Sequence, residues 1–216
     1  MTVLVTGGTV RLGLAISERL RKDGWRVITS SHRADAGADI VADLSSHMGA
    51  ACLYAEFLRM TGGIPPDALV NNAAIFDNRN NIDEETSKRI ETVNFISPQK
   101  LTMLMGGRET ECGAVVNIID SAALEGGEEG GVYLKSKRAL LEYTHRAAAM
   151  YAGVLRVNAV CPGPVMPPPG FSEKAPPTPF GRPSAEDVAN AVSFLLSAKA
   201  TTSCVIPVDG GALLEA

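Results

Sequence analysis

Three side chains with acid–base chemistry lie close together in the sequence, between residues 117 and 137. Tyr133 and Lys137 are four residues apart, a spacing that places the phenol and the ammonium on one face of a helix. An ammonium beside a phenol favours the phenolate, so the pair predicts a lowered pKa for Tyr133 and proton exchange near neutral pH. Asp120 ends the apolar stretch 113–119 and is expected to face the same crevice. Together they predict a proton-transfer site, although a tyrosine and a lysine also fall four apart by chance.

The N-terminus has the order of elements that a phosphate site requires. An apolar run over residues 2–6 leads into Gly7 and Gly8, and an amphipathic helix pattern begins at Leu12. The first turn of such a helix presents unpaired N–H groups and a partial positive charge to an anion. The usual dinucleotide fingerprint has a further glycine before Gly13, where this chain has Arg11, whose guanidinium can bind a phosphate or reach towards a substrate. A plain strand–helix turn is the alternative.

The end of the second predicted strand distinguishes between the two nicotinamide cofactors. An acidic residue at this place binds the ribose 2′-hydroxyl, whereas a basic residue accommodates a 2′-phosphate. The strand over 26–30 is followed by Ser31, His32 and Arg33. The sequence therefore favours NADPH, with a solvated loop charge at Arg33 as the alternative.

Strands and helices are predicted to alternate along the whole chain. The predicted strands cover residues 2–6, 26–30, 39–42, 68–70, 113–119, 154–160 and 204–208. The predicted helices start at Leu12 and cover 46–60, 83–105 with a break near Pro98, 132–151 and 184–197. This alternation predicts an α/β fold: a single domain over residues 1–216 with a doubly wound, seven-stranded parallel sheet and helices on both faces.

Several connecting segments have compositions that predict a role. Asn71 and Asn72 follow a strand, where their amides are expected to staple a turn to the next strand. Asn94 lies among apolar residues and needs hydrogen-bond partners. Residues 125–131 form a glycine-rich loop with three acids, and residues 162–183 hold nine of the 13 prolines. The proline-rich stretch predicts an irregular segment that passes over the site.

Composition excludes several classes of protein. The net charge of -4, with 20 lysines and arginines spread along the chain, gives no electrostatic footprint for nucleic acid. No apolar run approaches the roughly 20 residues that span a bilayer, and no signal peptide pattern precedes the first strand. The four cysteines show no metal-ligand spacing and are expected to be small buried residues in a reducing compartment. A cytoplasmic protein with no metal is predicted.

Seven motifs in a fixed order carry a resemblance to a known family. They are Thr6-Gly7-x-x-x-Arg11-x-Gly13, Asn71-Asn72-Ala73, Asn94, Asp120, Tyr133-x-x-x-Lys137, Pro162-Gly163 and Val208-Asp209-Gly210-Gly211. With these motifs the chain resembles the short-chain dehydrogenase/reductase family over its whole length. The resemblance implies a Rossmann fold and a nicotinamide cofactor. It also implies that Tyr133 gives the proton, that Lys137 lowers the pKa of the tyrosine and holds the ribose, and that Asn94 supports a water relay.

Within the family the chain is most similar to the pteridine reductases. Most members have serine in place of Asp120, whereas the pteridine reductases share both this aspartate and Arg11. The resemblance implies that Arg11 bridges cofactor phosphate and pterin, that Phe76 stacks on the pterin opposite the nicotinamide, and that a homotetramer forms on the helix after Tyr133. The chain departs from these enzymes at Ala74, where the trypanosomatid enzymes have serine, and from many family members at Pro167, where they have threonine.

The resemblance also assigns residues to the two binding sites. The substrate site comprises Arg11, Phe76, Asp120 and Tyr133. The cofactor site comprises Thr6, Gly7, Arg11, Leu12, Gly13, His32, Arg33, Asp43, Leu44, Asn72, Ala73, Tyr133, Lys137, Pro162, Gly163 and Val165.

Three hypotheses about function follow. The first is an NADPH-dependent reductase that converts a dihydropterin or dihydrofolate to the tetrahydro form. Protonation of a ring nitrogen calls for a carboxyl acid or a water that it positions, which suits Asp120 better than a serine, and a flat substrate can stack on Phe76. The second is a reductase of a small carbonyl compound, in which Asp120 only orients the substrate. The third is a module that binds NADPH without turnover.

Overall fold

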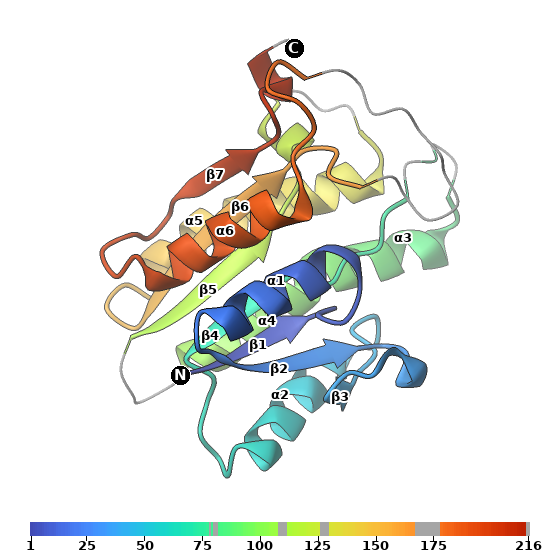
Figure 1. Cartoon of the computed structure of the whole chain (residues 1–216). Coiled ribbons are helices and arrows are strands. Elements are labelled where there is room, and N and C mark those ends of the chain that lie inside the picture. The colour runs from blue at the N-terminus through green and yellow to red at the C-terminus, as the bar shows by residue number, and fades with distance from the viewer. Residues whose placement is uncertain (78, 80–81, 108–111, 126–129, 167–177, 215–216) are drawn as a thin grey trace.

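The computed structural model describes residues 1–77, 79, 82–107, 112–125, 130–166 and 178–214. Its centre is a seven-stranded parallel sheet with the strand order β3-β2-β1-β4-β5-β6-β7 (Figure 1). The strands are β1 (Thr2–Thr6), β2 (Arg26–Ser31), β3 (Ile40–Val41), β4 (Ala68–Asn71), β5 (Gly113–Ile118), β6 (Leu155–Pro162) and β7 (Val205–Val208). This order confirms the predicted doubly wound sheet.

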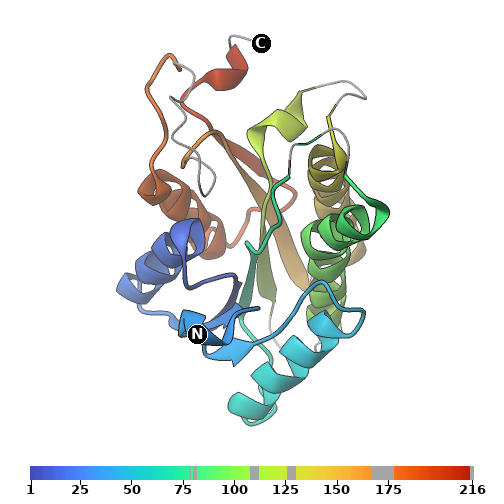
Figure 2. The same cartoon turned by 90° about the vertical axis from the view of Figure 1, so that its right-hand side faces the viewer.

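Helices connect successive strands and cover both faces of the sheet (Figure 2). They are α1 (Arg11–Lys22), α2 (Gly49–Met60), α3 (Glu84–Glu91), the π-helical turn η2 (Thr92–Ile96), α4 (Ser97–Gly106), α5 (Val132–Met150) and α6 (Ala185–Ser197). Short 3-10 turns lie at η1 (Ala34–Ala36), η3 (Ser121–Leu124) and η4 (Ala212–Leu214). Because both faces are covered, every residue of β4 and β5 is buried. All of these residues are apolar except Asn71 and Asn117, whose side chains form a hydrogen-bonded pair.

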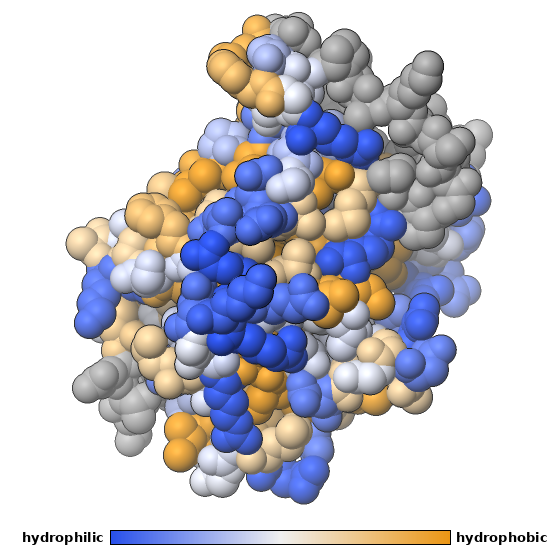
Figure 3. Space-filling view, viewed as in Figure 1, coloured by the Kyte–Doolittle hydropathy of each residue, from blue (hydrophilic) through white to orange (hydrophobic). Residues whose placement is uncertain are grey.

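The core consists of two layers, one on each face of the sheet. On one face, Ile16 and Leu20 of α1 pack with Val192 and Leu195 of α6. On the other face, α2, α4 and α5 contribute a second layer that includes Phe57, Leu53, Leu101 and Leu140. In the space-filling view, hydrophilic side chains gather in the middle of the outer surface, over α1 and the adjoining end of α6 (Figure 3). The helix pair is therefore amphipathic, with its apolar stripes turned to the sheet.

The helical segment 83–105 is interrupted earlier than predicted. The break was expected near Pro98, but the irregular turn is η2, and Pro98 lies in the first turn of α4. A proline is tolerated in a first helical turn because the N–H that it lacks has no partner there. The π-helical turn places Asn94 on the side that faces the sheet, where it is buried. Two predicted starts also differ: β3 has only two residues, and α2 begins at Gly49 rather than at residue 46.

The expectation that all four cysteines are buried is wrong for two of them. Cys161 is buried and Cys204 is partly buried, whereas Cys52 and Cys112 are exposed. Cys52 lies on the outer side of α2, off the face formed by Ala50, Leu53 and Phe57. Among the described residues, no helix combines the length and apolar character that a membrane span needs. Residues 126–129 of the glycine-rich loop, and residues 167–177 of the proline-rich segment with Pro167, lie outside the described residues.

Candidate active site

The motif residues meet at one edge of the sheet because they follow parallel strands. Neighbouring strands are in register at Val5 with Val70, at Asn71 with Asn117, and at Ile118 with Val160. The chain therefore leaves β1, β4, β5 and β6 at the same edge. In an open α/β sheet this carboxyl edge is where ligands bind.

Tyr133, Asp120 and Lys137 form a compact group at this edge. The Tyr133 hydroxyl donates a hydrogen bond to Oδ2 of Asp120 at 2.8 Å. The other carboxylate oxygen caps the turn after β5 by accepting from the backbone N–H of Ala122 at 3.0 Å. Lys137 Nζ donates to the backbone carbonyl of Ile118 at 2.9 Å and lies 5.8 Å from the centroid of the Tyr133 ring. The predicted grouping of phenol, ammonium and carboxylate is confirmed.

The predicted direction of the Tyr133 pKa is wrong in this structure. Burial raises the pKa of the phenol, and the neighbouring Asp120 carboxylate raises it further by repelling a phenolate and by accepting the phenolic proton. Burial also lowers the pKa of Lys137 to about 8, against the opposing attraction of Asp120. Tyr133 is therefore held as a protonated hydrogen-bond donor, which is the state that a proton donor must have before reaction.

Asn94 has the hydrogen-bond partners that its apolar surroundings demand. Its Oδ1 accepts from the backbone N–H of Ile75 at 2.8 Å, and its Nδ2 donates to the backbone carbonyl of the same residue at 3.0 Å. The side chain thereby ties η2 to the loop after β4. Nδ2 also donates to Ser136 Oγ on α5, a contact that no sequence motif indicated. The water relay remains a prediction.

Hydrogen bonds connect the glycine turn after β1 to the asparagine motif after β4. Asn72 donates through Nδ2 to the backbone carbonyls of Thr6 at 2.9 Å and Gly7 at 3.1 Å. The Thr6 hydroxyl accepts from the backbone N–H groups of Asn72 and Ala73, each at 3.0 Å. A Cβ on Gly13 would lie 2.0 Å from the Gly7 carbonyl oxygen, so only glycine fits there. The staple role is confirmed for Asn72, whereas Asn71 pairs with the Asn117 side chain instead.

The first turn of α1 fits the phosphates of a dinucleotide. Gly7 has φ 61° and Arg11 has φ 52°, a left-handed conformation that glycine adopts freely and that strains an arginine. In the same turn Thr9 Oγ1 is buried without a hydrogen-bond partner among the described residues. A buried hydroxyl without a partner is costly and suits an acceptor such as a phosphate oxygen. Thr9 was missed in the sequence, where Gly7, Arg11 and Gly13 were singled out; Leu12, predicted for the cofactor, lies beside Gly13 in this turn.

The residues predicted to bind adenosine and its 2′-phosphate lie beyond β2 and β3. Arg33 is exposed, and its Nε pairs with Oδ1 of Asp35 at 3.0 Å, an exposed ion pair that a phosphate can replace at little cost. The Asp43 carboxylate accepts from Ser45, and these hydrogen bonds, with the nearby charges of Arg89 and His32, lower its pKa. Leu44 is buried, and its carbonyl accepts from Ser97 at 2.8 Å.

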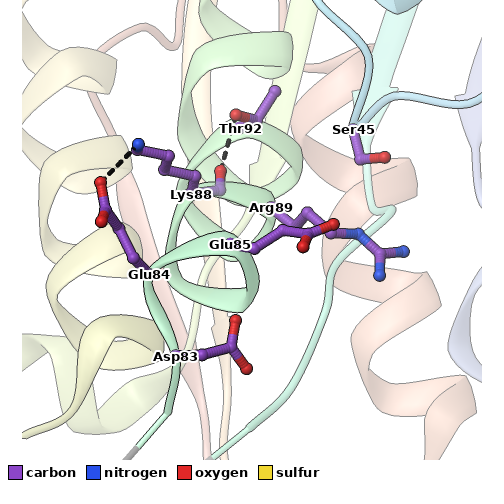
Figure 4. A pocket seen from close by; sticks show the side chains of 7 residues that line it. All are labelled: Ser45, Asp83, Glu84, Glu85, Lys88, Arg89 and Thr92. Atoms are coloured by element: carbon purple, nitrogen blue, oxygen red, sulfur yellow. Dashed lines mark hydrogen bonds and ion pairs between the residues drawn. The ribbon is translucent and has the colours of Figure 1, made fainter.

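A hollow of about 630 Å³ lies beside this region and apart from Tyr133. Its walls come from the loop after β3, from α3 with its N-cap and from the first residue of η2, and the side chain of Arg89 points towards Ser45 (Figure 4). The lining residues are Ser45, Asp83, Glu84, Glu85, Lys88, Arg89 and Thr92. Because these side chains lie away from the proton-transfer group, the hollow is not the reaction site.

The remaining predicted residues lie on the loop after β4 and in the turn after β6. The Phe76 ring is half exposed and meets the Tyr133 ring edge to face, with centroids 4.8 Å apart and planes at 73°. The Gly163 N–H donates to the Val208 carbonyl at 2.9 Å, and the Val165 N–H donates to the Gly163 carbonyl at 2.8 Å. The turn after Pro162 is thus fixed against β7. A second residue missed in the sequence is Cys161, whose thiol is buried close to Asp120 and Lys137 and whose pKa is raised to about 12, chiefly by burial.

Comparison with known proteins places the chain in a family. A family model described as enoyl-(acyl carrier protein) reductase matches residues 10–212. The protein named inactive 2-(S)-hydroxypropyl-CoM dehydrogenase 2, from Xanthobacter autotrophicus, is 36% identical over 193 residues, which cover 79% of this chain and 82% of that protein. The chain belongs to the short-chain dehydrogenase/reductase family. It is therefore an NAD(P)-dependent oxidoreductase of this family.

Solved structures of short-chain dehydrogenases/reductases superpose over nearly the whole chain. FolM alternative dihydrofolate reductase 1 from Brucella canis, complexed with NADP, matches with a TM-score of 0.85 at 30% identity, covering 99% of this chain and 94% of that chain. The 3-alpha-hydroxysteroid dehydrogenase from Pseudomonas sp. B-0831, complexed with NADH, matches with a TM-score of 0.81 at 27% identity, covering 99% and 98%. One of these two neighbours was solved with NADP and the other with NADH.

Proposed function

We propose that this protein is an NADPH-dependent reductase of a dihydropteridine, a dihydropterin or dihydrofolate that it converts to the tetrahydro form. The observation that carries the proposal is the hydrogen bond of 2.8 Å between Tyr133 and Asp120, which places a carboxylate and a protonated phenol at one point. The similarity to a dihydrofolate reductase of the same family supports it.

In the proposed reaction Tyr133 is the proton donor, and Asp120 and Lys137 assist it. A bound NADPH would supply the hydride to a ring carbon. Tyr133 gives its proton to the adjacent ring nitrogen, and the Asp120 carboxylate then takes a proton from solvent and passes it to the phenolate, so that the pair is ready again. Lys137, fixed by its bond to Ile118, provides the positive charge that stabilises the transient phenolate.

The cofactor preference follows from the residues beyond β2. Arg33 is exposed and forms an ion pair with its neighbour Asp35, and His32 lies next to it in the sequence. No carboxylate occupies the end of β2 at Ser31, where an acid would bind the ribose 2′-hydroxyl. Two basic side chains at this point favour a 2′-phosphate, so NADPH is proposed rather than NADH.

Phe76 and Arg11 form the proposed contacts to the ring. The half-exposed Phe76 ring lies beside Tyr133, where a planar substrate can stack on it. Arg11 begins α1 in a left-handed conformation, and strained backbone persists where the surrounding structure and function hold it. Its guanidinium is proposed to bridge the cofactor phosphate and the pteridine.

A reductase of small carbonyl compounds is the second candidate. The Tyr133–Lys137 pair suffices to protonate a carbonyl oxygen, and the likeness to a steroid dehydrogenase favours this chemistry. In that case Asp120 only orients the substrate. A protein that binds NADPH without turnover is the third candidate.

Two substitutions distinguish the candidates in steady-state assays of NADPH oxidation. Asp120→Ser is expected to keep NADPH binding and to lower dihydropteridine reduction by about 10²–10⁴-fold, the range expected for lost acid–base catalysis. Carbonyl reduction, if present, should survive this change and be abolished by Tyr133→Phe. If Asp120→Ser leaves dihydropteridine turnover unchanged, the role of Asp120 in proton transfer is refuted and the proposal loses the observation that carries it. If the wild-type protein reduces ketones but no dihydropteridine, the carbonyl reductase is correct. If the wild-type protein binds NADPH but reduces neither class, the third candidate is correct.

A further inference from the structure

Ser136 is a buried residue of α5 to which neither the motifs nor the proposed reaction assigns a role. It is 4% exposed and lies between Lys135 and the catalytic Lys137. Its hydroxyl donates to the backbone carbonyl of Tyr133 at 2.6 Å and accepts from Nδ2 of Asn94 at 3.1 Å. Because the single hydroxyl proton is used towards Tyr133, Ser136 faces Asn94 only as an acceptor.

Asn94 also binds the loop after β4, so it connects Ser136 to that loop. Its amide pairs with both the N–H and the C=O of Ile75, as a neighbouring strand would. Both protons of Nδ2 then have acceptors, one in Ile75 and one in Ser136, so the orientation of the amide is fixed. The side chain is 1% exposed, so no solvent can replace a lost partner.

The loop that Asn94 holds carries the aromatic ring of the site. Phe76 follows Ile75 directly, and its ring meets the ring of Tyr133 at a centroid distance of 4.8 Å. The contacts therefore form a closed circuit, from the Tyr133 backbone through Ser136, Asn94 and Ile75 to Phe76, and back to the Tyr133 ring. A circuit of this kind fixes the distance between the proton donor and the stacking surface.

We propose that Ser136 is a positioning residue that, with Asn94, clamps the loop after β4 and holds the Phe76 ring beside Tyr133 for a planar substrate. The inference deepens the proposed function and rests on it in one respect, namely that the ring substrate stacks on Phe76. Without the hydroxyl, Asn94 has a buried donor without a partner, and the loop can relax away from Tyr133. Small displacements of a positioned group are enough to change rates by up to about 10²-fold.

The kinetic test compares Ser136→Ala with Ser136→Thr in the full-length enzyme. Ser136→Ala is expected to raise the KM for a dihydropteridine about tenfold, to change kcat less than about threefold, and to leave the Kd of NADPH unchanged. Ser136→Thr keeps the hydroxyl and should restore most of the KM. Ser197→Ala is the matched control, because Ser197 makes the same type of bond, to the Phe194 carbonyl at 3.0 Å, on the exposed last turn of α6.

A double-mutant comparison shows whether Ser136 acts through Phe76. In a Phe76→Ala background, adding Ser136→Ala should raise KM no further, since the ring that the clamp positions is absent. An equal rise in both backgrounds, or a loss of NADPH affinity as large as the rise in KM, would overturn the proposal.

A reporter on the loop tests the clamp without any substrate. The chain has one tryptophan, Trp25, so Trp25→Phe combined with Phe76→Trp gives a single indole on the loop. Adding Ser136→Ala should lower the fluorescence anisotropy of this indole, whereas adding Ser197→Ala should not. Unchanged anisotropy would refute the clamp even if no pteridine is reduced, and lowered anisotropy with no pteridine turnover would refute the proposed function alone.

Discussion

The hydrogen bond between Tyr133 and Asp120 predicts how the phenol responds when the carboxylate loses its charge. Asp120→Asn keeps the shape of the side chain and removes the negative charge, which lies 2.8 Å from the phenolic oxygen. A unit charge at that distance repels a phenolate by about 1.5 kcal/mol in a water-like dielectric and by about 6 kcal/mol at an effective dielectric of 20. These energies correspond to about one to four pK units. The pKa of Tyr133 should therefore fall by at least one unit in Asp120→Asn.

The shift is measured by ultraviolet titration of the tyrosinate absorbance. The chain has four tyrosines, so the signal of Tyr133 is isolated by subtracting the titration of the matching variant that also carries Tyr133→Phe. Asp35→Asn, which alters an exposed carboxylate outside the site, serves as the control and should leave the midpoint unchanged. A midpoint that stays the same or rises in Asp120→Asn would refute the electrostatic argument.

Three further predictions concern the cofactor site, the strained turn and the buried ammonium. Arg33→Ala should weaken NADPH far more than NADH in fluorescence titrations, and similar losses for both would exclude a role at the 2′-phosphate. Arg11→Gly relieves a left-handed φ of 52° and should leave the free energy of unfolding unchanged or raise it by up to about 1 kcal/mol, while KM for the substrate rises. A loss of stability in denaturant titrations would contradict the strain. Because burial lowers the pKa of Lys137 to about 8, the unfolded chain binds more protons than the folded protein above that pH. The free energy of unfolding should therefore rise between pH 8 and 9, relative to Lys137→Met, by at most about 1.4 kcal/mol per pH unit; a fall over this range would show that the ammonium is not destabilised by burial.

The sequence predicted the fold and the meeting of the motifs because both follow from regular patterns. Apolar strands that alternate with amphipathic helices allow only a parallel sheet with covered faces. Once the sheet is parallel, Gly7, Asn72, Asp120 and Pro162 must lie at one edge, since Pro162 ends a strand and the other three follow one within two residues. The structure confirms this for all four.

The electrostatics of the site could not be predicted from spacing alone. Four-residue spacing places Lys137 near Tyr133, but the ammonium donates to the Ile118 carbonyl while the phenol donates to Asp120. The acceptor and the depth of burial then raise the pKa of the phenol, and both depend on the packing of η3 and β6 against α5. Contacts between distant segments, such as that of Ser136 with Asn94, leave no trace in a single sequence.

The sequence of α2 contained the information needed to predict that Cys52 is exposed. The buried positions of α2, among them Ala50, Leu53 and Phe57, define its inner face. Cys52 is out of phase with that face, so the helical period already indicated its exposure. The prediction relied on the general tendency of cysteine to be buried. The spacing of the buried residues along α2 predicts the exposure of Cys52 correctly.

The rate of NADPH oxidation by the wild-type protein tests the central claim most directly. It should be followed at saturating NADPH with a dihydropterin, with dihydrofolate and with a set of small ketones. The account predicts that kcat/KM for at least one dihydropteridine exceeds the value for every ketone. If the ketones are reduced and the dihydropteridines are not, the assignment of the substrate to the Tyr133–Asp120 pair is contradicted.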